Sequence, residues 1–246
     1  MKKGVKILLI VVLVIAVIGV VGFQYLKNNG LSGQYANTDA KEGQIKVACV
    51  GDSITYGHGI TDWEENNYPA QLQKILGDTY HVANFGSSGA CVNPDGDQPY
   101  IGREVYQNSL AYEADVLVFM LGTNDAKPEN WNGIDEFIKD YNELLDSYLN
   151  GANRPSEIYV GLCAEAYYTE EHDPTTGIAG YDIQPAMVDE IAAEIEAYFA
   201  LHEAKVKIIN VHTLTEAHPE WFAKDGIHPN NDGARAIAEL VAESIQ

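Results

Sequence analysis

The stretch Ile45-Lys-Val-Ala-Cys-Val-Gly-Asp-Ser53 decides the type of fold. Residues 45–50 are mostly apolar and predict a short buried strand, and Gly51 permits a tight turn directly after it. A serine after such a turn stands at the carboxyl end of a strand, where open parallel sheets bind their ligands. A helix that begins near Ser53 would direct backbone N–H groups at the same point. Gly-Asp-Ser alone is a weak signal, because in most proteins it is only a turn.

Further apolar runs predict more strands, and helical patterns separate them. The predicted strands are 45–50, 81–85, 116–121, 158–162 and 206–211. The apolar helix faces are Tyr68, Leu72, Ile75 and Leu76, then Ile134, Phe137, Ile138, Tyr141, Leu144, Leu145 and Tyr148, and finally Ala234, Ile237, Ala238 and Val241. Another helix is expected over 183–202, between the second and the last of these, with Pro185 in its first turn. This alternation predicts an α/β fold, a three-layer α/β/α sandwich around a five-stranded parallel sheet.

The N-terminus carries a second, separate signal. Residues 7–23 contain no charged side chain, and this run is long enough for one transmembrane helix. Lys2, Lys3 and Lys6 precede this run and would stay in the cytoplasm, so the rest of the chain would lie outside it. We therefore expect a membrane anchor or signal segment over 1–23, a flexible linker over 24–44 and one domain over 45–246. Cleavage of the segment as a signal peptide would instead give a secreted protein.

Charge and cysteine content exclude several classes of function. The chain has 15 basic and 36 acidic residues and a formal net charge of −21. Nucleic acid is therefore not an expected partner, because phosphate binding requires Lys and Arg. Cys49, Cys91 and Cys163 are widely spaced and form no C-x-x-C pair, which indicates neither a zinc site nor a dense disulfide framework. We expect no cofactor and no metal in the reaction.

Three more segments follow predicted strands or precede the last helix. They are Asn84-Phe-Gly-Ser-Ser-Gly89, Leu121-Gly-Thr-Asn-Asp125 and Asp225-Gly-Ile-His-Pro229. Together with Gly51-Asp-Ser53, in this order and at these spacings, they resemble the SGNH (GDSL) hydrolase family over nearly all of 45–246. The resemblance implies the flavodoxin-like fold of that family. No G-x-S-x-G is centred on Ser53, which disfavours an α/β-hydrolase.

The resemblance also implies catalytic roles. Ser53 would be the nucleophile, His228 its base, and Asp225 the carboxylate that orients the imidazole. The oxyanion hole would be formed by the backbone N–H groups of Ser53 and Gly86 and by the side-chain amide of Asn124.

Within the family, some segments are similar to those of bacterial carbohydrate acetylesterases, including sialate O-acetylesterase-like proteins. These segments are 51–59, Tyr68-Pro69, 84–91, 122–131 and 218–221. The fourth strand departs from this pattern, because the run 163–174 follows it where relatives often have a proline-rich segment. The loop 163–174 is expected to line the pocket, so this departure bears on the substrate and leaves the catalytic residues unaffected.

Other residues allow a functional and a structural interpretation. Asp52 is expected to cap the turn at Ser53, and Asp125 to organise the loop that directs Asn124. Four aromatic side chains could stack on sugar rings or pack within the protein; they are Tyr56, Trp63, Tyr100 and Trp131. His58 lies between two glycines near Ser53 and could contact the substrate, but an ordinary loop histidine is the expected role. The other histidines share no metal-ligand spacing; they are His81, His172, His202, His212 and His218.

Two acidic segments also allow a functional and a structural interpretation. The segment from Asn93 to Glu104 resembles a calcium loop, but Gln98 replaces the glycine required at its sixth position. The acidic loop 167–173 is expected to be a solvated surface.

The expected function is hydrolysis of a short acyl ester, with acetyl favoured, on an extracytoplasmic carbohydrate. The expected partners are a small-molecule or glycan ester and, through the N-terminal helix, a membrane. A lysophospholipase or thioesterase on the same catalytic residues is the first alternative. A catalytically inactive glycan-binding module is the second, and the intact set Ser53, Gly86, Asn124, Asp225 and His228 argues against it.

Overall fold

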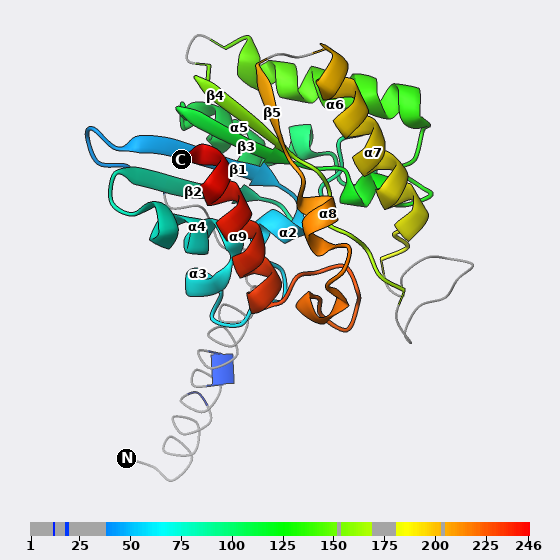
Figure 1. The fold of residues 1–246 in the computed structure, drawn as a ribbon, viewed down its shortest axis with the longest axis horizontal. Helices are drawn as coiled ribbons and strands as arrows, with labels where there is room; N and C mark the ends of the chain where they lie inside the picture. The colour runs from blue at the N-terminus through cyan, green and yellow to red at the C-terminus, as the bar shows by residue number, and fades with distance from the viewer. Residues whose placement is uncertain (1–11, 13–17, 20–37, 152–153, 169–180, 203–204) are drawn as a thin grey trace.

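The computed structural model describes residues 12, 18–19, 38–151, 154–168, 181–202 and 205–246 (Figure 1). Within these ranges, no helix has the length and apolar character that crossing a membrane requires. The expected anchor over 1–23 and most of the linker over 24–44 lie outside the described residues, apart from three positions in the apolar run. The expected membrane helix therefore stays a prediction.

Strands and helices alternate through the described chain. In order they are β1 (Ile45–Gly51), α2 (Ser53–Tyr56), α3 (Trp63–Asn66), α4 (Tyr68–Leu76), β2 (Tyr80–Gly86), η1 (Tyr100–Gly102), α5 (Glu104–Ala111), β3 (Val116–Met120), η2 (Thr123–Ala126), α6 (Ile134–Leu149), β4 (Glu157–Gly161), α7 (Pro185–His202), β5 (Val206–Ile209), α8 (Val211–Thr215), η3 (Pro219–Trp221) and α9 (Asn231–Ile245). The α and η labels denote α-helices and short 3-10 helices.

The five strands form one parallel sheet in the order β2-β1-β3-β4-β5. Because β1 pairs with both β2 and β3, Gly51 lies opposite Gly86 on one side and Met120 on the other. The carboxyl ends of these three strands therefore meet at one edge of the sheet, where ligand sites of this architecture occur. The predicted five-stranded parallel sheet is confirmed.

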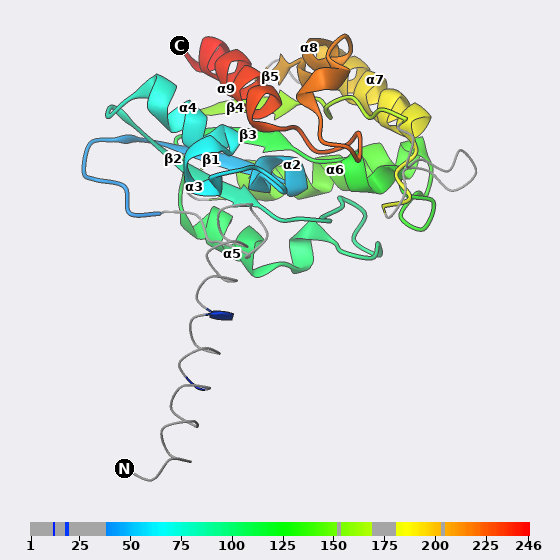
Figure 2. The same cartoon turned by 90° about the horizontal axis from the view of Figure 1, so that it is seen from below.

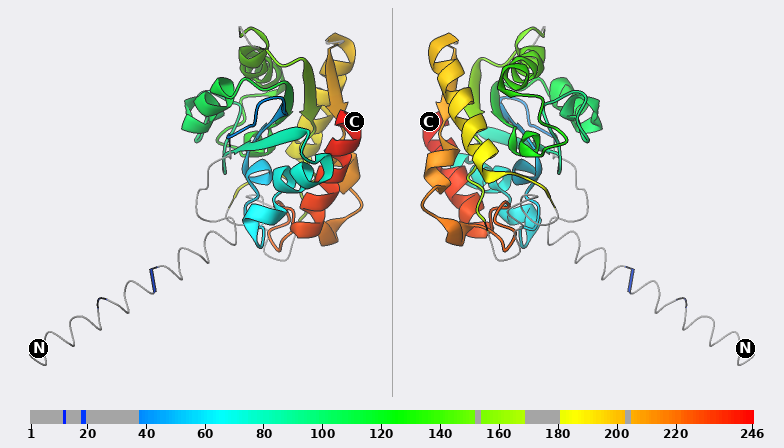
Figure 3. Two further views of the ribbon diagram at one scale, coloured as in Figure 1. Left: turned by 90° about the vertical axis from the view of Figure 1, so that its left-hand side faces the viewer. Right: turned by 90° about the vertical axis from the view of Figure 1, so that its right-hand side faces the viewer.

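Helices cover both faces of the sheet and give it two separate apolar cores. Alternate residues of β3 divide between them, since Leu117 and Phe119 face one core and Val116 and Val118 the other. The first core packs against α5, α6 and α7, and the second against α4 and α9. Figure 2 shows α4 and α9 above the sheet and α5 below it, and Figure 3 shows red α9 and the green helices on opposite sides. The predicted three-layer sandwich is confirmed.

Local signals account for the ends of several helices. The Asn67 side chain accepts a hydrogen bond from Ala70 N at 3.0 Å and caps α4. Asn230 does the same for α9, from Asp232 N at 3.0 Å. Pro185 is the first residue of α7, where its missing N–H costs nothing. Pro185 lies in the first turn as predicted, although the helix begins at residue 185 and not at 183.

Two local predictions are wrong. The last strand ends at Ile209 and not at residue 211, because the Asn210 side chain accepts from Thr213 N at 2.8 Å and starts α8 instead. Ile75 does not share the buried face of α4 with Leu72 and Leu76, since 41% of it is exposed. The buried residues of the helix are instead Tyr68, Pro69, Leu72 and Leu76.

Candidate active site

Ser53 lies at the junction of β1 and α2, at the edge where the strands β1, β2 and β3 end. Asp52 precedes it as the N-cap of α2, and its Oδ1 accepts a hydrogen bond from Ile54 N at 2.8 Å. The predicted cap is confirmed. The cap fixes the turn that presents the hydroxyl, and the first turn of α2 follows directly. Ser53 is 5% exposed, so its hydroxyl is accessible only from one side.

A continuous chain of hydrogen bonds joins Ser53 to His228 and Asp225. His228 Nε2 lies 2.9 Å from Ser53 Oγ, and His228 Nδ1 lies 2.8 Å from Asp225 Oδ2. The residues 53 and 228 are 175 positions apart in the chain, so only the fold brings them together. The three side chains predicted as nucleophile, base and orienting carboxylate thus share one site.

Asp225 is held as a carboxylate by its own loop. Its Oδ1 accepts from Ile227 N at 2.9 Å and from His228 N at 3.0 Å, while Oδ2 faces the imidazole. Burial by itself would raise the pKa of Asp225, but the hydrogen bonds and the charge of His228 lower the pKa to about 2. The carboxylate is therefore ionised at neutral pH and accepts the Nδ1–H, which leaves the Nε2 lone pair for Ser53.

Two aromatic side chains enclose the His228 ring. The centroid of His58 lies 4.6 Å from that of His228, and Tyr181 approaches edge-on with its centroid at 5.2 Å. Burial lowers the pKa of His58, and the neighbouring His228 lowers it further. The sequence favours an ordinary loop histidine at position 58, whereas in the structure His58 lies in the wall of the site. Its position between two glycines after the Ser53 turn was the only available signal.

Gly86 does not lie where an oxyanion donor is needed. Its N–H donates to Asn84 Oδ1 at 2.9 Å, and a Cβ at this position would meet Tyr56 N at 2.0 Å. The residue lets the end of β2 pack directly against α2, and it is not among the residues that line the pocket. Gly89, three residues later, lines the pocket with Ser53 and Asn124. The prediction of Gly86 as a donor is therefore wrong, and Gly89 is the glycine in place.

Asn124 lies on η2 after β3 and lines the same pocket. Its Nδ2 donates one hydrogen bond to Ala90 O at 3.1 Å, and the amide carries a second N–H. The neighbouring Asp125 accepts from Val92 N and Asn93 N at 2.9 Å. Burial raises the pKa of Asp125 to about 7 and that of Asp52 to about 6. Asp125 thus ties η2 to the loop after β2, as expected of a supporting residue.

A pocket of about 390 Å³ opens over Ser53 and His228. Its far wall holds three carboxylates, Asp97, Glu129 and Asp182, and one cation, Lys127. The Lys127 ammonium is paired with Asp97 at 3.1 Å, so its charge is largely neutralised inside the wall. Tyr181, Asp182 and Ile183 come from the chain just before α7. The loop expected to line the pocket, 163–174, contributes none of its described residues 163–168 to the lining, and its residues 169–174 lie outside the described residues.

The four aromatic residues considered for sugar stacking are packing residues. Tyr100 is 0% exposed and its hydroxyl donates to Phe85 O at 2.7 Å. Trp63 is buried, and its Nε1–H donates to the carbonyl oxygen of the equally buried Tyr56 at 2.6 Å. Trp131 packs on Phe137 with a centroid distance of 6.2 Å. The pocket lining includes none of them, so the stacking interpretation is wrong for this set.

Asn93 and Asp97, in the segment from Asn93 to Glu104, are hydrogen-bonded to other protein groups. Asp97 accepts from Lys127 and from Asn130 Nδ2 at 2.8 Å. Asn93 Oδ1 accepts from Asp95 N at 2.9 Å, and Asn93 Nδ2 donates to Asn130 O. The Lys127 ammonium thus occupies the position in which a cation would have to bind Asp97.

The remaining histidines differ in their surroundings. His81 is bonded to the Tyr112 hydroxyl, and His218 stacks on Trp221 with centroids 3.7 Å apart. His172 and the side chain of His202 lie outside the described residues, as do residues 169–173 of the acidic loop. His212 lies beside Glu165 and Asp189, a grouping that sequence spacing does not reveal. The three cysteines are free and buried.

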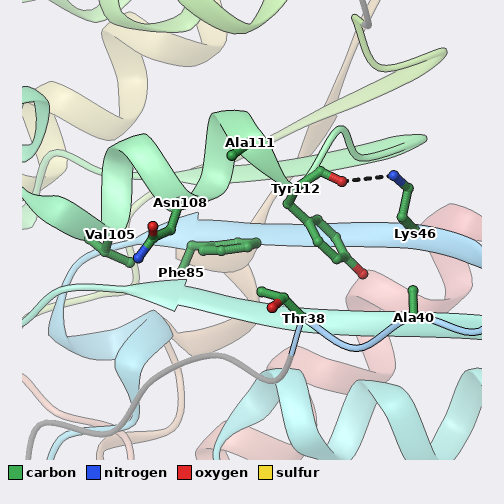
Figure 4. Close-up of a pocket in the computed structure, with 8 residues that line it drawn as sticks. All are labelled: Thr38, Ala40, Lys46, Phe85, Val105, Asn108, Ala111 and Tyr112. Carbon is green, nitrogen blue, oxygen red and sulfur yellow. Dashed lines mark hydrogen bonds between the residues drawn. The ribbon is translucent and has the colours of Figure 1, made fainter.

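A larger cavity of about 540 Å³ lies away from this site, between α5 and the strands β1 and β2 (Figure 4). Its polar groups include Lys46, whose ammonium donates to Tyr112 O at 2.8 Å. Thr38 and Ala40, from the segment before β1, close one side. It holds no nucleophile with an adjacent base, and we assign no chemistry to it.

Comparison with known proteins assigns the chain to a class. Residues 49–236 match the GDSL-like lipase/acylhydrolase family, and the chain belongs to this family. An acetylxylan esterase of Xylanibacter ruminicola is 35% identical over 220 residues, which cover 84% of this chain and 44% of the relative. The chain thus spans less than half the length of that relative.

Solved structures share the fold at low sequence identity. A carbohydrate acetylesterase, Est24, from Sinorhizobium meliloti has a TM-score of 0.63 at 19% identity, covering 82% of this chain and 98% of that one. The aryl esterase of M. smegmatis has a TM-score of 0.62 at 18% identity, covering 81% and 97%. At these identities the comparison shows the fold alone.

Proposed function

We propose that this chain is a serine esterase that removes acetyl groups from a neutral carbohydrate. The observation that carries the proposal is the hydrogen-bonded series Ser53–His228–Asp225 at the mouth of a polar pocket. The chemistry of acyl transfer requires an activated hydroxyl, a base of fixed tautomer and donors for the developing oxyanion. The groups around Ser53 offer a candidate for each of the three.

In the proposed reaction, Ser53 Oγ attacks the ester carbonyl while His228 Nε2 takes its proton. Asp225 stabilises the resulting imidazolium through Nδ1–H. His228 then returns the proton to the sugar oxygen, which leaves as an alcohol, and the acetyl group remains on Ser53. A water molecule, deprotonated by the same imidazole, attacks this acetyl-enzyme and releases acetate.

The oxyanion would be stabilised by donors from three loops. Ser53 N–H lies at the start of α2, and the Asn124 amide and Gly89 N–H come from η2 and from the loop after β2. We propose Gly89 in place of Gly86, whose N–H is already donated to Asn84. Removing one such donor typically lowers the rate by about 10²–10³.

The charge of the pocket favours a neutral substrate. Three carboxylates face one lysine that already pairs with one of them, so an anionic sugar such as a sialate would be repelled. The acetylxylan esterase relative acts, by its name, on a polymer whose backbone is neutral. Within the family resemblance, this distinction favours a xylan-type over a sialate-type ester.

The alternatives receive less support from the site. A lysophospholipase or long-chain thioesterase needs an apolar groove, whereas most side chains around this pocket are polar. A silent glycan-binding module would not require the 2.9 Å contact between His228 and Ser53. The location also stays a proposal, an extracytoplasmic domain anchored by the apolar run 7–23 or secreted after its cleavage.

The deciding experiment measures acetate release by the wild type and by Ser53→Ala. We expect a loss of at least about 10³-fold in kcat, with an unchanged Tm. Ser156→Ala is the matched control, since this exposed serine lies at the opposite end of the sheet and hydrogen-bonds Asp115 O. Hydrolysis that survives Ser53→Ala would refute the mechanism.

The substrate is tested separately. We expect kcat/KM to be higher for acetylated xylo-oligosaccharides than for an O-acetylated sialic acid, and higher for acetyl than for long-chain nitrophenyl esters. A preference for the sialic acid or for long chains would overturn the substrate proposal and leave the catalytic mechanism standing.

A further inference from the structure

A second group of polar side chains lies beyond the carboxyl ends of β4 and β5, formed by His212, Glu165 and Asp189. None of the three lines the pocket over Ser53. They come from three elements: Glu165 from the loop after β4, Asp189 from α7 and His212 from α8. Figures 1 and 2 show α8 beside α7. His212 Nε2 lies 3.5 Å from Glu165 Oε2 and 3.6 Å from Asp189 Oδ1. One donor atom of each side chain lies within 4.8 Å of the other two.

The tautomer of His212 is fixed from outside this group. Its Nδ1 lies 3.1 Å from the carbonyl oxygen of Cys163. A carbonyl only accepts hydrogen bonds, so Nδ1 carries the hydrogen and the neutral ring presents the Nε2 lone pair to the two carboxylates. Metal-binding histidines are commonly oriented in this way, with the other ring nitrogen donating to a backbone carbonyl.

Three electron-pair donors facing one another require a positive charge between them. None of the described contacts of these three side chains is with a lysine or an arginine. A metal ion bound between the three donor atoms would supply this charge.

The spacing matches that of a small divalent cation. A tetrahedral ion with ligands at about 2.1 Å places neighbouring ligand atoms about 3.4 Å apart, close to the 3.5 and 3.6 Å observed. Glu165 Oε1 is already used by Ala166 N at 3.1 Å, which leaves Oε2 for the ion. The Asp189 side chain is 56% exposed, so a water molecule can reach the fourth position.

We propose that Glu165, Asp189 and His212 form a structural Zn²⁺ site. A mixed set of imidazole and carboxylate ligands suits zinc better than calcium or magnesium, which prefer oxygen ligands alone. The ion would link the loop after β4 to α7 and α8. The same loop continues to Tyr167, whose N–H donates to Gly226 O at 2.8 Å in the segment that carries Asp225 and His228. Zinc would thus stabilise the support of the catalytic loop and take no part in the reaction.

The test titrates the full chain with ZnCl₂ and measures binding by calorimetry. We expect one zinc ion per chain with a raised Tm, and at least about 10-fold weaker binding in Asp189→Asn and in His212→Ala. Asp189→Asn is the safer variant for folding, because its side chain is largely exposed. His218→Ala is the matched control, since His218 pairs with only one carboxylate, that of Glu220 at 2.8 Å.

A second measurement identifies the ligands. Co²⁺ bound in place of zinc should give the visible absorption of a tetrahedral site in the wild type and in His218→Ala, and lose it in both ligand variants. Equal zinc binding by wild type, Asp189→Asn and His212→Ala would overturn the proposal. Absence of tight zinc binding by the wild type would do so as well. Neither outcome affects the proposed role of Ser53 as the nucleophile.

Discussion

At the scale of single residues, Asp225 determines which nitrogen of His228 is free to act as a base. Its Oδ1 accepts two backbone N–H groups, from Ile227 and His228, and its Oδ2 accepts from Nδ1. The two oxygens are therefore not equivalent. An amide at this position would keep its oxygen towards the backbone and turn its NH₂ towards the imidazole.

Asp225→Asn is accordingly expected to lower kcat by about 10⁴-fold. The NH₂ would force the hydrogen of His228 onto Nε2, so the imidazole could no longer accept the proton of Ser53. The two backbone hydrogen bonds would persist, and the Tm should change little. Steady-state kinetics and a melting curve check both expectations. An active Asp225→Asn enzyme would show that His228 is not the base.

Asp125 makes a different prediction, because its pKa is raised to about 7 by burial. In the unfolded chain this carboxyl loses its proton at about pH 4. Between pH 4 and 7 the folded protein therefore binds more protons than the unfolded one, and stability falls as pH rises. The side chain at position 125 stays neutral in Asp125→Asn, so this variant lacks that dependence of stability on pH.

We expect the free energy of unfolding of the wild type, relative to Asp125→Asn, to fall by up to about 4 kcal/mol from pH 4 to pH 7. Urea unfolding of both proteins at several pH values measures the difference. Asp225 is common to both proteins, so its opposite effect, a loss of stability as pH falls below about 4, cancels. A difference that does not change with pH would mean that Asp125 is ionised throughout.

At the scale of secondary-structure elements, the close approach of β2 to α2 sets the position of the nucleophile turn. A Cβ on Gly86 would lie 2.0 Å from Tyr56 N and 2.6 Å from the carbonyl carbon of Thr55, both backbone atoms that cannot move without moving α2. Gly102 offers a comparison, because the nearest atom to its Cβ would be Pro99 Cγ at 3.7 Å.

Gly86→Ala is expected to destabilise the fold by about 1–3 kcal/mol and to lower kcat, since the displaced helix carries Ser53. Gly102→Ala should change stability by less than about 1 kcal/mol and leave kcat unaltered. Chemical denaturation and nitrophenyl acetate hydrolysis measure the two effects. Equal stability and activity in both variants would show that the contact between β2 and α2 is dispensable.

At the scale of the whole molecule, the dominant property is the negative charge. The chain carries a formal net charge of −21, and this sum already includes its exposed ion pairs, such as Arg235 with Glu239. Like charges at this density repel one another in the compact state more than in the expanded one.

Raising NaCl from about 0.05 to 0.5 M should therefore raise the Tm, by roughly 2–4 °C if screening contributes about 1 kcal/mol. Differential scanning calorimetry at neutral pH measures the shift. A Tm that falls with added salt would mean that attractive ion pairs outweigh the net repulsion.

The amino-acid sequence by itself determined the alternation of strands and helices, because apolar periodicity is local and each element needs one or two buried faces. It also indicated Ser53, Asn124, Asp225 and His228 as candidate site residues, because the four segments that contain them or adjoin them resemble those of the SGNH (GDSL) hydrolase family. Only the tertiary structure decided that Gly89 and not Gly86 faces the pocket, that Tyr100 and Trp63 are buried and that His58 encloses His228. It alone brought Glu165, Asp189 and His212 together. These facts depend on which backbone groups are already hydrogen-bonded and on which elements pack side by side, and such contacts join residues far apart in the chain.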